Sequence, residues 1–185
     1  MIGNIYIMLI RHFKTINNSN NEEKINYDKS FQKAEIFSIY IYDFIKKHPS
    51  IKKIKFYTSE KERTLVTALV ISSKIKSNII EKKQKYIEIH DPIIENNIDR
   101  DPKKQNKEKI CNYFNDKINN IFEEDTLYIY ITHSSIIHNL FKCMLEVCAG
   151  KSIDDFQIKK IHGYSLSFIA KNDNKISYGF NYKMD

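Results

Sequence analysis

Residues 5–18 read IYIMLIRHFKTINN, and the rest of the chain is interpreted around this stretch. Its first six residues are apolar or aromatic and carry no charge, which is typical of a strand buried on both faces and central in a sheet. Arg11 and His12 follow where the strand ends. Ligands of open α/β sheets bind at the carboxyl ends of the strands, so we expect both side chains in a functional site.

Residues 126–132, TLYIYIT, form a second strongly apolar stretch. We expect it to be a strand beside the first one. His133 follows directly, and the apolar spacing from Ser134 onward predicts that a helix begins at once. Because two neighbouring strands would then each end in a histidine, His12 and His133 should meet over one crevice.

The remaining pattern alternates helices and strands, which indicates one α/β domain over residues 1–185. Apolar residues at helical spacing predict helices over 28–47, from Ser59 to about 74, and over 103–122. Strands are expected over 53–57 and 85–90, and a hairpin from 164–170 and 176–182. Residues 17–26 and 91–102 are polar and are expected to be loops.

Arg63 lies in the first turn of the helix expected after Ser59, where Ser59 and Glu62 have the spacing of a capping box. A helix N-terminus already favours anions, so an arginine there suits a bound anion better than it suits the helix. The chain has only three arginines, Arg11, Arg63 and Arg100, among many lysines. Arginine grips a phosphate or carboxylate with two parallel hydrogen bonds, although a structural ion pair remains an alternative for Arg63.

The formal net charge of +7 comes mainly from scattered lysines. These lysines are not interleaved with stacking aromatic residues, which argues against a nucleic-acid partner. A modest attraction of small anionic molecules is the inference that the charge supports.

Cys111, Cys143 and Cys148 show no metal-ligand spacing and lie in apolar helical patterns. We expect them to be reduced core residues of an intracellular protein. No stretch reaches the roughly 18 apolar residues of a membrane span. Residues 1–10 lack a preceding basic region and are interpreted as a strand, not as a secretion signal. We therefore expect a cytoplasmic protein without a membrane segment.

Three segments together resemble the motifs of the histidine phosphatase (phosphoglycerate mutase-like) superfamily. Arg11 and His12, followed by Thr15 and Asn18, resemble its RHG motif in the longer form RHGETxxN. Residues 58–68, TSEKERTLVTA, resemble its [TS]S-x-x-x-R-x-x-x-TA segment, and residues 132–137, THSSII, resemble its SHGG-[VI]-[IL] segment. The order is that of the family, and the match spans nearly the whole chain. The resemblance implies a three-layer α/β/α sandwich with a mostly parallel central sheet.

The resemblance also implies a two-step phosphoryl transfer that needs no metal or cofactor. His12 would attack phosphorus and form a phosphohistidine, which water then hydrolyses. Arg11, Arg63 and His133 would surround the phosphoryl oxygens, and Asn18 would add a hydrogen bond. The expected partner is a small phosphorylated substrate.

In many members of this family a glutamate in an L-x-E stretch protonates the leaving group. The nearest match in this chain is Ile93-Ile94-Glu95. Glu95 is therefore our candidate general acid, ahead of Asp91 and Asp99. The alternative is that Glu95 is only a surface charge.

The chain departs from the family motifs at several positions. Phe13 stands in place of a glycine, where its side chain would narrow the pocket or offer a face for a substrate ring. Lys14 replaces the common glutamate, and Ser134 and Ser135 replace two glycines. The substitutions leave the arginines and histidines of the motifs in place, so we expect them to affect substrate range.

Three functions remain open at this point. The first is a phosphatase for phosphomonoesters, the second a phosphatase for protein phosphohistidine, and the third a non-catalytic module that binds a phosphorylated ligand. Only 38 positions separate Glu95 from His133 (133 minus 95). That leaves little room for the long insert of the dimeric glycolytic mutases, which favours a small phosphatase over a mutase. The sequence predicts no oligomeric state.

Overall fold

The computed structural model describes residues 4–13, 15–17, 23–81, 87–99, 106–117, 120, 122–149 and 163–169. Within these ranges, six strands form the main sheet in the order β5-β4-β7-β1-β8, with β6 also paired to β4. The strands are β1 (Asn4–Arg11), β4 (Lys53–Thr58), β5 (Glu88–Ile89), β6 (Ile93–Ile94), β7 (Thr126–Thr132) and β8 (Gly163–Ile169).

The centre of the sheet is parallel. β1 pairs with β7, β7 with β4, and β4 with both β5 and β6, all in parallel. β8 runs antiparallel to β1 at the edge. The prediction that the two strongly apolar stretches are neighbouring strands is confirmed, and every side chain of β7 is buried.

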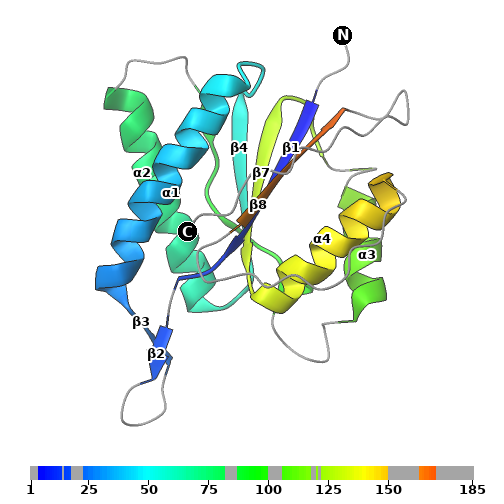
Figure 1. Cartoon of the computed structure of the whole chain (residues 1–185), viewed down its shortest axis with the longest axis horizontal. Helices are drawn as coiled ribbons and strands as arrows, with labels where there is room; N and C mark the ends of the chain where they lie inside the picture. Colours follow the sequence, from blue (N-terminus) through cyan, green and yellow to red (C-terminus); the bar gives the residue numbers. More distant parts are fainter. Residues whose placement is uncertain are drawn as a thin grey trace.

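Helices cover both faces of this sheet (Figure 1). The helices are α1 (Tyr27–Lys47), α2 (Glu62–Glu81), α3 (Lys107–Asp116) and α4 (Ser134–Ala149). In Figure 1, α1 and α2 lie on one side of the sheet and α3 and α4 on the other, so the predicted three-layer sandwich is confirmed.

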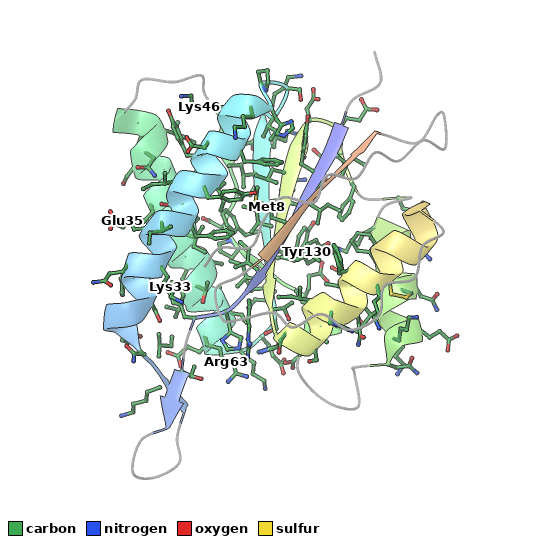
Figure 2. All side chains as sticks on the ribbon, in the orientation of Figure 1. Met8, Lys33, Glu35, Lys46, Arg63 and Tyr130 are labelled. Carbon is green, nitrogen blue, oxygen red and sulfur yellow. A yellow bond between two sulfur atoms is a disulfide. The ribbon has the colours of Figure 1, made fainter. Side chains whose placement is uncertain are left out.

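Alternation along β1 builds two separate cores. Successive side chains of a strand point to opposite faces. Accordingly, Ile7 and Leu9 pack in one cluster with residues of α3 and α4, whereas Tyr6, Met8 and Ile10 pack in the other with residues of α1 and α2. Figure 2 shows Met8 toward α1. A strand that supplies both cores must be apolar throughout, which explains its uninterrupted pattern.

Some element boundaries differ from the predictions. Within the loop expected over 17–26, β3 (Glu23–Ile25) pairs with β2 (Thr15–Asn17) as a small separate sheet. The loop expected over 91–102 contains β6 and a short 3-10 helix, η1 (Asn96–Ile98). α2 continues to Glu81 because Ile75 extends its buried face. The predicted strand over 176–182 lies outside the described residues.

The cysteine prediction is wrong for two of the three residues. Cys111 of α3 and Cys143 of α4 form a disulfide with their Cα atoms 5.3 Å apart. The two are 32 positions apart in the sequence, so only the packing of α3 against α4 reveals the pair. Because these two cysteines are oxidised, the expected reduced state of the cysteines no longer supports a cytoplasmic location. The side chain of Cys148 lies outside the described ones.

None of the described helices combines the length and the apolar character that crossing a bilayer requires.

Candidate active site

The two histidines meet at the carboxyl ends of β1 and β7. Arg11 is paired with Thr132 in the β1–β7 ladder, and the His12 N–H extends that ladder by donating to the Thr132 carbonyl at 3.1 Å. His12 and His133 therefore follow directly after paired residues. Their ring centroids lie 5.0 Å apart in an edge-to-face arrangement, and both side chains are buried. The predicted convergence of the two strand ends is present.

One ring nitrogen of His12 is already engaged. Its Nδ1 lies 2.6 Å from the carbonyl oxygen of Phe13. A carbonyl only accepts hydrogen bonds, so the proton of a neutral imidazole is on Nδ1, and Nε2 keeps its lone pair. The backbone thus selects the tautomer in which Nε2 carries the lone pair.

The surroundings keep this imidazole neutral. Burial, with the positive charges of His133, Arg63 and Arg11, lowers the pKa of His12 to about 3, against the opposing effect of its hydrogen bond to Phe13. An imidazole with this pKa is unprotonated at neutral pH. It is therefore able to attack an electrophile without first losing a proton.

The two arginines reach the histidines from different elements. Arg11 is the last residue of β1, and Arg63 lies in the first turn of α2, as predicted. Figure 2 shows Arg63 at the lower end of the sheet, where β1 ends. Both guanidinium charges are close enough to lower the pKa of His12. Positive charge beside a neutral imidazole favours the binding of an anion.

Ser59 contacts His133 and does not open the helix as predicted. Its Oγ lies 3.2 Å from His133 Nε2 and accepts a hydrogen bond from the Lys61 N–H at 3.3 Å. α2 begins at Glu62, two residues later than an N-cap at Ser59 would place it, so the predicted capping box is wrong. The sequence identified Ser59 from its spacing but not its contact, because that contact joins segments 74 positions apart.

Phe13 does not have the position expected of a pocket residue. Its side chain is fully buried in the core cluster shared with α1 and α2, so the prediction that it narrows the pocket or faces a substrate ring is wrong. A large apolar ring is stabilised more by this core than by a polar, anion-binding site. Its backbone N–H donates to Thr67 Oγ1 at 3.0 Å, a contact that the sequence analysis missed.

Glu95 lies just beyond β6, with its N–H bonded to the Thr58 carbonyl at 2.7 Å. Its carboxylate accepts a hydrogen bond from Lys117 Nζ at 2.6 Å, and both side chains are mostly buried. The Lys117 ammonium also lies 5.0 Å from the ring centroid of Tyr57 and 5.3 Å from that of Tyr113. Glu95 is thus part of a buried ion pair, and the alternative of a mere surface charge is wrong.

The other candidate residues differ in their placement. Asp91 is exposed, whereas Asp99 is buried. The residue before Asp99 is Ile98, and its carbonyl accepts a hydrogen bond from the hydroxyl of Thr132. Asn18, Lys14 and Arg100 lie outside the described residues. Among the described residues, no group of three or more His, Cys, Asp or Glu side chains is arranged to hold a metal ion.

Comparison of the sequence with protein-family models and with curated proteins gives no match. Comparison of the structure gives matches to solved structures. A mycobacterial glucosyl-3-phosphoglycerate phosphatase is 8% identical, with 96% of this chain and 97% of that chain covered and a TM-score of 0.57. Phosphoglycerate mutases from Plasmodium falciparum and Bacillus anthracis are each 13% identical. They cover 98% and 97% of this chain, and 91% and 92% of their own, with TM-scores of 0.53 and 0.54. The chain therefore has the same fold as these phosphoglycerate mutases and this phosphatase.

Proposed function

We propose that this protein is a phosphatase that hydrolyses phosphomonoesters of a small anionic substrate through a phosphohistidine on His12. The observation that carries the proposal is the neutral His12 imidazole, with Nδ1 bound to the Phe13 carbonyl and its ring 5.0 Å from that of His133. The positive charges of Arg11 and Arg63 act on the same imidazole. A nucleophile and a set of cationic groups thus share one site.

The reaction would proceed in two displacements. Nε2 of His12 attacks phosphorus, an Nε2–P bond forms, and the P–O bond to the leaving group breaks, with Glu95 as the proposed donor of the proton that the leaving alkoxide takes up. Water then attacks the phosphohistidine, the N–P bond breaks, and inorganic phosphate leaves. Arg11, Arg63 and His133 stabilise the charge on the phosphoryl oxygens, with Asn18 as a further proposed hydrogen-bond donor.

The test uses an aryl phosphate and radiolabelled substrate. We expect the wild-type chain to release phosphate and, in a single turnover, to carry label on His12. His12→Ala should lose both, whereas His90→Ala should retain them, because His90 lies beyond β5, bound to Glu88 at 3.1 Å. Full activity in His12→Ala would contradict the proposal. Phosphate binding without label on His12 would favour the non-catalytic binding module instead.

Protein phosphohistidine is the second candidate substrate, and the Glu95–Lys117 pair favours it. The leaving alkoxide of an ester needs a proton, and Glu95 is the proposed donor of this proton. The Glu95 carboxylate, however, already accepts a hydrogen bond from Lys117 Nζ at 2.6 Å. The leaving nitrogen of a phosphohistidine needs less protonation. Glu95→Gln should slow hydrolysis of an alkyl phosphate strongly if esters are the substrate. If phosphohistidine is the substrate, the same variant should dephosphorylate a phosphohistidine peptide at nearly the wild-type rate.

A further inference from the structure

We propose that Thr67 is a positioning residue that ties the backbone beside His12 to the helical turn that carries Arg63. Its catalytic consequence rests on the proposed function, whereas its structural consequence does not. Thr67 lies in the second turn of α2 and is fully buried. It touches neither a substrate nor the reacting atoms in this proposal, and it acts through the two residues that do.

The hydroxyl of Thr67 has one proton, and the geometry assigns it. Thr67 Oγ1 donates to the carbonyl of Arg63, one turn earlier, at 2.5 Å. The same oxygen accepts the N–H of Phe13 at 3.0 Å. Hydroxyl groups of threonine often bond back to a helix carbonyl, but such a bond alone involves only the helix. Here the acceptor side of the hydroxyl also holds a loop 54 positions away in the sequence.

Phe13 transmits this constraint to His12. Its carbonyl accepts the Nδ1 proton of His12, so the orientation of the Phe13 backbone decides which ring nitrogen is free. The backbone is fixed at one point by Thr67 and at another by the Phe13 side chain, which is buried in the core with α1 and α2. Phe13 thereby acts as an anchor at a position where the family motif has glycine.

The consequence is a linked geometry for the nucleophile and the anion-binding arginine. Without the Thr67 hydroxyl, the N–H of Phe13 would be buried without its acceptor, which is energetically unfavourable. Rotation of this peptide group toward another acceptor would then be favoured. The Nδ1 proton of His12 would then lose its fixed acceptor. A shift of about 1 Å between a nucleophile and a bound substrate costs as much as roughly 100-fold in rate.

The experiment compares Thr67→Val, which keeps the shape and removes the hydroxyl, with Thr67→Ser, which keeps the hydroxyl. Ser72→Ala is the matched control, because Ser72 lies on the same helix and makes the same type of bond to a backbone carbonyl, that of Leu69, at 3.0 Å. We expect Thr67→Val to lower kcat/KM for an aryl phosphate roughly 10- to 100-fold, mainly through kcat. Thr67→Ser and Ser72→Ala should stay close to wild type.

Two readouts do not depend on activity. ¹⁵N NMR at neutral pH should show His12 as the Nδ1–H tautomer in the wild type and in Thr67→Ser, and as a mixture in Thr67→Val. Hydrogen exchange should show the Phe13 amide protected in the wild type and in Thr67→Ser. Both measurements remain informative if the chain has no phosphatase activity, so failure of the proposed function would be seen separately.

Three results would overturn the proposal. The first is a single Nδ1–H tautomer that persists in Thr67→Val, and the second is an equal loss of activity in Thr67→Val and Ser72→Ala. The third is an unprotected Phe13 amide in the wild type. This last measurement needs no variant, and it decides the matter even if Thr67→Val fails to fold.

Discussion

His12 shows how backbone placement fixes the tautomer of a buried imidazole. The imidazole is buried, its Nδ1 is bound to the Phe13 carbonyl, and the charges around it are positive. Burial and the surrounding positive charge each make protonation of the ring costly to the folded protein, and they outweigh the opposing effect of the hydrogen bond to Phe13. The lowered pKa of His12 should therefore make the free energy of unfolding depend on pH.

Protonation of His12 should destabilise the fold as the pH falls. Its pKa is about 3 in the folded chain and near 6.5 in the unfolded chain, so between these values the unfolded state binds more protons and stability rises with pH. The free energy of unfolding should fall by about 2 kcal/mol more in the wild type than in His12→Gln between pH 7 and pH 5. Denaturant unfolding at both pH values measures this difference.

Ser72→Ala is the control for that measurement, since Ser72 is buried on α2 and its side chain has no group that titrates in this range. It should follow the wild-type pH dependence. Identical slopes for the wild type and His12→Gln would show that His12 is not held neutral by the fold.

The sequence was a good guide to the residues that gather at the site. It was a poorer guide to the hydrogen-bond partners of those residues. His12, His133 and Arg63 were identified because strand ends and a helix start have recognisable patterns. Contacts such as that of Thr67 with Phe13 join distant segments, and no local pattern encodes them. The error at Phe13 has a related origin, since a motif position does not reveal which way a side chain points.

At the scale of elements, long apolar patterns were predicted and short or polar elements were not. β1, β7 and α1 agree with their predicted ranges within about two residues. β3 and β6 were expected to be loops. Strands of two or three residues are stabilised by pairing with a neighbour, and their own sequence contributes little. The positions of these short strands therefore depend on tertiary packing, which the local sequence does not specify.

The disulfide between α3 and α4 should contribute measurably to stability. Cys111 and Cys143 are 32 positions apart, and closing a loop of that length in the unfolded chain is expected to stabilise the fold by about 3 to 4 kcal/mol. A reductant should lower the free energy of unfolding of the wild type by this amount. The Cys111→Ala, Cys143→Ala double variant should be equally destabilised and insensitive to reductant. A wild type whose unfolding does not respond to complete reduction would contradict this expectation.

At the scale of the whole molecule, the three-layer sandwich implied by the family resemblance agrees with the structure, and the residue pattern is compatible with it. Two strands without polar interruption require cover on both faces, and amphipathic helices between them supply it. The net charge of +7 is a second property of the whole chain, and two of its positive charges, those of Arg11 and Arg63, act on His12.

An anionic substrate should therefore bind more slowly as the ionic strength rises. Raising the salt concentration from 0.01 to 0.1 M shortens the screening length from about 30 to about 10 Å. For an aryl phosphate, we expect kcat/KM to fall several-fold over this range and kcat to change little, because screening acts on encounter and not on the bound complex. Steady-state kinetics at fixed pH measure both constants. A kcat/KM that stays constant or rises with salt would contradict electrostatic attraction.

The ladder between β1 and β7 has an evolutionary consequence. His12 and His133 are neighbours because the residues before them, Arg11 and Thr132, are paired through main-chain groups that every amino acid except proline possesses. Mutations inside these strands can exchange one apolar side chain for another without separating the imidazoles. Most side chains of these two strands can therefore change while the two imidazoles stay adjacent.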